Sequence, residues 1–180
     1  MSDPVTVRAA GPEDAPAMLA IYAPIVERTA ISFELIPPTV AEFEQRVRAT
    51  TRDLPWFVAE GLGEVVGYAY ASRHADRAAY RWSVDTTIYV ADRWRGRRVG
   101  TALYGVLVAE LRALGYVSAY AGITWPNDAS VALHKKVGFV SIGRFVNAGF
   151  KHGAWHDVSL WYLALREPPG SPAEPLQWPR

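Results

Sequence analysis

The hydrophobic pattern of the chain changes repeatedly between two spacings. Short apolar stretches bounded by Gly, Pro, Asn or Asp are typical of strands, and the first of them alternates apolar and polar residues. Seven strands are predicted on this basis: Val5–Ala9, Trp56–Glu60, Val65–Ala71, Ser83–Ala91, Val117–Thr124, Phe139–Val146 and Val158–Leu165.

Four longer stretches have the spacing of a helix. The first begins near Pro12 and carries an apolar stripe at three- and four-residue intervals. The second has Thr39 and Glu42 in the positions of a capping box. The other two predicted helices are Val99–Leu114 and Asn127–Gly138.

The predicted element order is βααβββαβαββ. This order indicates an α+β fold with α/β-like features, in which helices flank a mixed central β-sheet. A chain of 180 residues suits one domain, which we place at residues 1–166. Residues 167–180 are rich in proline, so we expect an irregular and mobile C-terminal tail.

Composition narrows the class of protein. The chain has no cysteine, which excludes disulfides and thiolate chemistry and suits a reducing compartment. Its net charge of +1 argues against nucleic acid as the main partner. No apolar run reaches the length of a membrane span, and Met1–Pro4 lacks the features of a signal peptide. We therefore expect a cytoplasmic enzyme or binding protein for a small molecule.

The most distinctive local feature is a basic turn that leads into the third predicted helix. It reads Arg93-Trp94-Arg95-Gly96-Arg97-Arg98-Val99-Gly100-Thr101. Free N–H groups at a helix start attract phosphate, glycine permits close approach of the backbone, and arginines suit a diphosphate. A solvated basic turn is the alternative interpretation. The turn matches neither the phosphate-loop pattern nor GxGxxG, which disfavours a nucleoside triphosphate or a dinucleotide.

The segment Arg95–Gly100 resembles the (Q/R)xxGx(G/A) pyrophosphate loop of the GNAT N-acetyltransferase superfamily. Asn127 is similar to the family's asparagine beside the CoA pantetheine, and Lys135–Phe139 resembles the (K/R)xGF helix ending. The strand Thr86–Val90 resembles the one that holds the acetyl carbonyl. The resemblance implies the GNAT fold and acetyl-CoA as cosubstrate. It also implies this cofactor site: Ile88, Tyr89, Val90, Arg95, Gly96, Arg97, Arg98, Val99, Gly100, Thr101 and Asn127.

One position departs from the family's loop. Arg98 stands where the pattern has its first glycine. If the backbone there needs a positive φ, an arginine is strained, because a Cβ disfavours that conformation. If only its N–H is used, the substitution is tolerated.

A narrower resemblance covers two longer segments. Ala79–Val90 is similar to the AYxWTVExSVYV stretch of phosphinothricin N-acetyltransferases, and Ala148–Val158 is similar to their AGFKHGxWHDV signature. The likeness extends from about Val5 to Leu165. It implies acetylation of the α-amino group of a small glutamate-like amino acid, such as phosphinothricin or methionine sulfoximine, by direct transfer in a ternary complex. It also implies a homodimer.

The same resemblance assigns catalytic roles. An acceptor ammonium must lose a proton before it attacks, and the family places a carboxylate for this task where Asp85 stands. That residue is usually glutamate, so an ordered water could bridge the shorter reach of Asp85. His134 stands near the family's tyrosine that protonates the departing thiolate. A strand-end carboxylate and a half-buried helix histidine are the respective structural alternatives.

Recognition of an amino-acid carboxylate needs a cation or exposed N–H groups. Arg77 matches an arginine of the narrower group, and the segment around it is basic. Hydrogen bonds and an apolar wall complete the predicted substrate site: Phe33, Arg77, Tyr80, Asp85, Thr86 and Thr87.

Alternatives stay open at this level. The spacing of His152, His156 and Asp157 permits a zinc site, but the resemblance makes them scaffold residues, and we expect no metal. The acceptor could be another amine, such as a peptide N-terminus or an aminoglycoside. A non-catalytic GNAT domain that binds acyl-CoA is the alternative from a different functional class.

Overall fold

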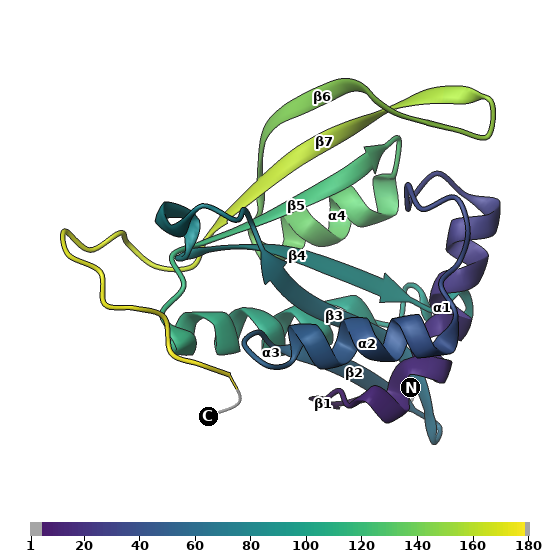
Figure 1. Cartoon of the computed structure of the whole chain (residues 1–180). Coiled ribbons are helices and arrows are strands. Elements are labelled where there is room, and N and C mark those ends of the chain that lie inside the picture. The colour runs from purple at the N-terminus through teal and green to yellow at the C-terminus, as the bar shows by residue number, and fades with distance from the viewer. Residues whose placement is uncertain (1–4, 179–180) are drawn as a thin grey trace.

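The computed structural model describes residues 5–178, and it contains one mixed sheet of seven strands in the order β1-β2-β3-β4-β5-β7-β6 (Figure 1). The strands are β1 (Val5–Ala9), β2 (Trp56–Gly61), β3 (Glu64–Arg73), β4 (Ser83–Val90), β5 (Ser118–Trp125), β6 (Val140–Lys151) and β7 (Ala154–Ala164). The helices are α1 (Ala15–Arg28), α2 (Val40–Thr50), α3 (Val99–Leu114) and α4 (Asp128–Val137). The predicted order βααβββαβαββ is confirmed. The prediction for Met1–Pro4 and the end of the predicted tail lie outside the described residues.

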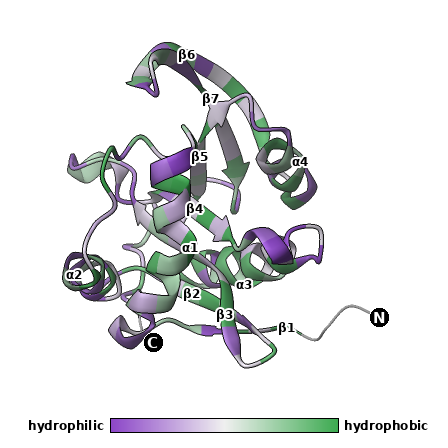
Figure 2. Cartoon of the chain, turned by 90° about the vertical axis from the view of Figure 1, so that its right-hand side faces the viewer, coloured by the Kyte–Doolittle hydropathy of each residue, from purple (hydrophilic) through white to green (hydrophobic). Residues whose placement is uncertain are grey.

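Two hydrophobic clusters hold helices to the two faces of the sheet. Leu103, Leu107 and Leu111 of α3 are fully buried in the larger cluster. Met18 of α1 and Phe43 of α2 belong to the other cluster. In Figure 2, α2 and α3 accordingly lie on opposite sides of the strands. None of the helices in the described part of the chain is long and apolar enough to cross a membrane.

The predicted starts of the first two helices agree with the structure, except that a short turn precedes α1. The Thr39 N–H donates to Glu42 Oε2 at 2.7 Å and the Glu42 N–H donates to Thr39 Oγ1 at 3.3 Å, so the capping box of α2 is confirmed. The first helical stretch opens as a short 3-10 turn over Pro12–Asp14 before α1 begins. Asp14 closes this junction by binding the guanidinium of Arg8.

The feature that creates the site is the divergence of β4 from β5. β4 pairs with β3 along Val84–Val90, but it pairs with β5, in parallel, only over Ser83–Asp85. Beyond that point β5 continues against β7 alone (Figure 1). The edge of β4 from Thr86 onward is therefore left without a strand partner on the β5 side, which frees main-chain groups for a ligand.

The predicted limits of the last two strands were wrong. Residues 147–157, which the sequence pattern left outside any strand, extend β6 and β7 into a long hairpin with a turn at His152-Gly153. A bulge lies between Phe145 and Gly149, where Asn147 takes a φ of 52°. The Asp157 carboxylate accepts the Asn147 N–H at 2.8 Å, and this bond lowers the pKa of Asp157.

The described part of the C-terminal tail, residues 167–178, contains no helix or strand and lies against the domain. The Trp82 indole donates to the carbonyl of Ala173 at 2.7 Å. The Leu176 N–H donates to the carbonyl of Leu114 at 2.7 Å, and Trp178 packs edge-on against Phe57.

Candidate active site

The start of α3 is open to a ligand. Val99, Gly100 and Thr101 occupy its first turn, where N–H groups have no carbonyl partner within the helix, and no side chain caps them. This contrasts with α4, where Asn127 Oδ1 accepts the Ser130 N–H at 3.2 Å. An uncapped helix start attracts an anion through its N–H groups and the helix dipole.

A cavity of about 320 Å³ lies at this helix start. It is bounded by the end of β4, the basic turn and the first turns of α3 and α4. Every predicted cofactor residue lines it except Arg97, whose guanidinium lies over the Trp94 ring at 5.2 Å. The pattern missed Trp94, Ser130, Leu133 and Lys136, which also line the cavity. Ser130, Leu133 and Lys136 are on α4, so their contribution depends on how α4 approaches α3.

Close helix packing shapes this cavity. A Cβ at Gly100 would lie 2.7 Å from Leu133 Cδ2, so a larger residue there would force the end of the Leu133 side chain to move. Arg98 takes φ 65° and ψ 8°, the left-handed conformation that the family's glycine would adopt without strain. Of the two cases considered for position 98, the structure shows the strained one, in which an arginine takes a positive φ.

A smaller cavity of about 110 Å³ continues between the diverging strands. Thr87 and Ile88 line it from β4, and Gly122 and Thr124 line it from β5. It shares Asn127 with the larger cavity, together with several neighbours. A long ligand with an anionic end could therefore run from the start of α3 into the gap beside the open edge of β4.

His134 lies at the base of the smaller cavity and is 3% exposed. Its Nδ1 is 2.8 Å from the Ser130 carbonyl, so Nδ1 carries the proton, and its Nε2 accepts from the Tyr104 hydroxyl at 2.7 Å. Burial lowers the pKa of His134, so the ring is neutral near pH 7. Both ring nitrogens are thus occupied within the protein, and this geometry does not favour the predicted donation of a proton to a thiolate.

Asp85 is on β4, opposite Tyr120 of β5. Burial raises the pKa of its carboxyl, and a hydrogen bond from His74 opposes this rise. His74 Nδ1 is 2.7 Å from Asp85 Oδ1. The sequence pattern treated His74 only as part of a basic loop. The strand register, which pairs Ser72 with Asp85, is what brings the loop histidine to the carboxylate.

The predicted substrate residues lie in four places: the two faces of β4, the cavity beside the C-terminal tail and the loop between α1 and α2. Asp85 and Thr87 lie on the face of β4 that carries α1 and α2, because alternate residues of a strand share a face with Tyr89. Thr86 points to the opposite face, where its hydroxyl donates to the Tyr120 carbonyl at 3.1 Å. Its predicted contact with the acceptor therefore lacks a free hydroxyl proton.

Arg77 and Tyr80 line a separate cavity of about 520 Å³ beside the C-terminal tail. No hydrogen bond or ion pair within residues 5–178 is seen for the Arg77 guanidinium, whereas Arg73 pairs with Asp53 at 3.1 Å. The Tyr80 ring lies 5.6 Å from the His74 ring, which connects this cavity to Asp85.

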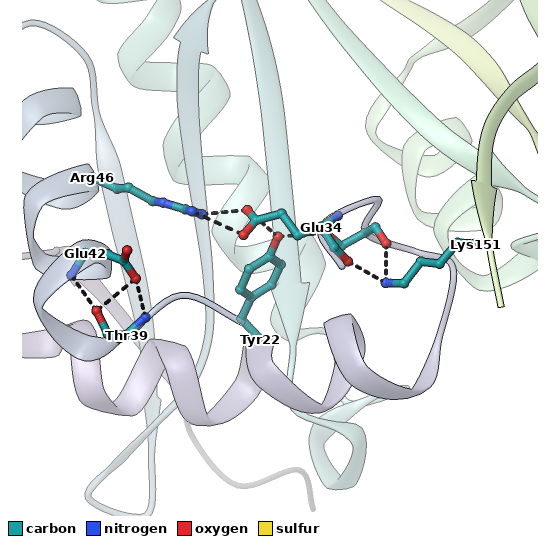
Figure 3. Close-up of polar contacts among 7 residues, drawn as sticks. Tyr22, Glu34, Thr39, Glu42, Arg46 and Lys151 are labelled. Atoms are coloured by element: carbon teal, nitrogen blue, oxygen red, sulfur yellow. Dashed lines mark hydrogen bonds and ion pairs between the residues drawn. The ribbon is translucent and has the colours of Figure 1, made fainter. Parts of the chain in front are cut away.

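Phe33 lies on the loop between α1 and α2, against the β6–β7 hairpin. A Cβ at Gly149 would collide with its ring. The loop is held by the buried ammonium of Lys151, which donates to the carbonyls of Val26, Ser32 and Glu34 at 2.6–2.8 Å. Figure 3 shows this ammonium next to the loop.

Glu34 continues the network on the same loop. Its carboxylate accepts from Arg46 at 2.6 Å and from the Tyr22 hydroxyl at 2.9 Å (Figure 3). Contacts to α1, α2 and the hairpin therefore set the position of Phe33. Among the described residues, no group of three or more His, Asp or Glu side chains is arranged to hold a metal ion.

Comparison with known proteins places the chain in a family. Residues 7–160 match the model of the acetyltransferase (GNAT) domain. The chain is 37% identical to the phosphinothricin N-acetyltransferase of Streptomyces viridochromogenes over 96% of this chain and 95% of that protein. It is 33% identical to the L-methionine sulfoximine/L-methionine sulfone acetyltransferase of Pseudomonas paraeruginosa, over 89% of this chain and 94% of that protein.

A solved structure agrees with these sequence relatives. The GNAT superfamily phosphinothricin acetyltransferase of Sinorhizobium meliloti, crystallised in complex with AcCoA, has a TM-score of 0.91 and 35% sequence identity to this chain. The match covers 99% of this chain and 97% of that one. The chain therefore belongs to the GNAT family of acetyltransferases.

Proposed function

We propose that this chain transfers the acetyl group of acetyl-CoA to the α-amino group of a small glutamate-like amino acid, by direct transfer in a ternary complex. The observation that carries the proposal is the uncapped start of α3, whose cavity continues into the gap between β4 and β5. Asp85 lies on β4 next to that gap. An anion site, a cavity beside the open edge of β4 and a carboxylate on the same strand support the proposal.

Acetyl-CoA would occupy the two cavities, which share lining residues. Its diphosphate would accept hydrogen bonds from the N–H groups of the first turn of α3, with Arg98 and Lys136 lining the same cavity. Its pantetheine would pass Asn127 toward the open edge of β4. Free N–H groups on that edge, around Ile88–Val90, would stabilise the oxyanion that develops on the acetyl carbonyl.

The acceptor would approach from the face of β4 that carries Asp85 and Thr87. Asp85 would assist the removal of a proton from the acceptor ammonium, and the Arg77 guanidinium would bind the carboxylate of the substrate. The support for a phosphinothricin-like or methionine sulfoximine-like acceptor is the naming of the relatives and the uncompensated charge of Arg77.

A screen of amines with acetyl-CoA tests this proposal. We expect release of free CoA thiol with L-phosphinothricin or L-methionine sulfoximine, and much slower release with an aminoglycoside or a peptide N-terminus. Acetyl-CoA alone should raise the unfolding temperature, since a ligand at a hundred times its Kd stabilises a protein by about 2.7 kcal/mol. Absence of that stabilisation would reject the cofactor assignment. Stabilisation without thiol release for any amine would favour a non-catalytic acyl-CoA-binding domain.

We also propose a cytoplasmic homodimer. The support for the cytoplasmic location is the absence of cysteine from the sequence, which suits a reducing compartment. The support for the homodimer is a set of exposed apolar side chains on the β6–β7 hairpin: Val140, Ile142, Phe145, Val146, Phe150 and Trp155. A patch of this kind on a strand pair is unfavourable in water and would be covered by its copy across a twofold axis. Light scattering should give the mass of two chains, and Val146→Glu together with Trp155→Glu should give the mass of one. A monomeric wild-type protein would contradict the proposal.

A further inference from the structure

The His74–Asp85 pair joins two segments at one end of the β3–β4 hairpin. His74 directly follows β3, and Asp85 is on β4, where it pairs with Ser72. The His74 Nδ1 and the Asp85 Oδ1 are 2.7 Å apart. This distance is that of a strong hydrogen bond with an ionised partner.

The imidazole is held in one orientation by its neighbours. It stacks on the Tyr120 ring with centroids 4.4 Å apart and planes at 24°. The Tyr80 ring contacts it edge-on at 5.6 Å. A ring that is stacked on one side and bonded at Nδ1 has little freedom to rotate.

The second ring nitrogen is available. Nε2 of His74 has no hydrogen-bond partner within residues 5–178, and the side chain is 32% exposed. Because the Asp85 carboxylate accepts at Nδ1, the neutral ring carries its proton there and its lone pair at Nε2. His134, in contrast, has both nitrogens bonded inside the protein.

We infer that His74 is the general base of the reaction and that Asp85 orients it. This inference rests on the proposed acetyl transfer and deepens it. The carboxylate fixes the tautomer and stabilises the imidazolium that forms, as in other base–carboxylate pairs. An imidazole is also better matched than a carboxylate to removing a proton near neutral pH.

The proton balance is complete. One ammonium proton of the acceptor goes to His74 Nε2, and the amine lone pair then attacks the acetyl carbonyl carbon. The C–S bond breaks with its electron pair on sulfur, and the second nitrogen proton neutralises the thiolate. The amide and CoA thiol leave, and the exposed His74 returns its proton to water.

Few other charges act on the pair. The Asp85 carboxyl is shifted by burial and by His74 alone. The rings that face the imidazole are Tyr80 from the loop and Tyr120 from β5. Arg73, which precedes His74, is directed to Asp53.

The test compares His74→Asn with the wild-type protein over pH 6–10, with the amine that the wild-type protein acetylates best. We expect kcat/KM for the amine to fall about 100-fold or more at pH 7. The deficit should shrink as the pH approaches the pKa of the free amine, because neutral amine then needs no base. His74→Gly should regain part of its activity when imidazole is added. The gain in unfolding temperature with acetyl-CoA should stay at the wild-type value in both variants.

His152→Asn is the matched control, because His152 is exposed on the hairpin turn at φ 51°, which asparagine tolerates. It should keep the wild-type pH profile. Asp85→Asn combined with His74→Asn should be little slower than either variant alone, since the two act as one unit. A His74→Asn protein with the wild-type profile would overturn the inference while leaving acetyl transfer intact. A wild-type protein that acetylates no amine would reject the proposed function and this inference with it.

Discussion

Arg98 stores strain at the start of α3. A non-glycine residue in the left-handed conformation costs about 1–2 kcal/mol, whereas glycine loses about 0.5–1 kcal/mol more chain entropy on folding. Arg98→Gly should therefore raise the free energy of unfolding by about 0.5–1 kcal/mol in urea titrations. Arg95→Gly is the control, because Arg95 has an ordinary φ of −64° and its glycine variant should gain nothing. A destabilised Arg98→Gly protein would show that the arginine side chain contributes more than its backbone costs.

His134 should make the stability of the protein depend on pH. Its pKa is lowered by burial, so below about pH 6.5 the unfolded chain binds a proton that the folded chain does not. Stability is then lost as the pH falls through 6.5, with a slope of up to about 1.4 kcal/mol per pH unit from this group. Urea titrations between pH 7.5 and 5 should show a shallower slope for His134→Gln. His152→Asn, at an exposed position, is the control and should keep the wild-type slope. If His134→Gln also kept the wild-type slope, the argument from the burial of His134 would be wrong.

For individual residues, a sequence pattern could indicate the local arrangements but not the contacts between distant positions. The residues predicted to bind the cofactor, namely Ile88–Val90, Arg95–Thr101 and Asn127, all line the cavity at the start of α3 except Arg97. Their assignment from the sequence needed only a local arrangement, because an anion site at a helix start is formed by neighbouring residues. The bonds of His74 to Asp85 and of His134 to Tyr104 depend on residues 11 and 30 positions apart. Only the strand register and the packing of α3 against α4 bring them together, so no local pattern could predict them.

At the element scale, the β6–β7 hairpin shows why a local pattern fails. Residues 147–149 read Asn-Ala-Gly, which have low strand propensity, so the strand was expected to end before them. Pairing with β7 continues beyond a bulge because Asp157 satisfies the N–H of Asn147. The long signature at Ala148–Val158 is thus explained by a hairpin that reaches the loop between α1 and α2.

Lys151 is the contact that joins this hairpin to the loop. Lys151→Met removes an ammonium that satisfies three carbonyls, and leaving buried acceptors unpaired costs about 1–3 kcal/mol. We expect a loss of about 2–4 kcal/mol in urea titrations and a higher KM for the amine, because Phe33 loses its support. The KM for acetyl-CoA should change less. Lys135→Met, at an exposed position, should stay within about 0.5 kcal/mol of the wild-type protein.

At the scale of the whole molecule, the element order was predictable and the sheet order was not. Alternation of strand and helix patterns gives βααβββαβαββ directly. The insertion of β7 between β5 and β6, and the divergence of β4 from β5, follow from long-range pairing. The candidate site lies in that divergence. Residues of β4 and of the start of α3 could be proposed for it from the sequence, whereas the shape of its cavities depends on the long-range pairing.

The tail provides the last prediction, because it closes the cavity that contains Arg77. Pro175, Leu176 and Gln177 line that cavity, and no tail residue up to position 178 lines the cavity at the start of α3. Deletion of residues 173–180 removes the bonds to Trp82 and Leu114 and uncovers apolar surface. We expect a loss of about 2–3 kcal/mol of stability and an altered KM for the amine.

The added thermal stability with acetyl-CoA should be unchanged in the shortened chain, which calorimetry with and without acetyl-CoA would measure. Pro169→Ala, at an exposed position of the tail, is the control and should match the wild-type protein. An unchanged KM for the amine would separate the Arg77 cavity from acceptor binding. A weakened response to acetyl-CoA would instead show that the tail supports the sheet as a whole, since it contacts α3 and β2 through Leu114 and Phe57.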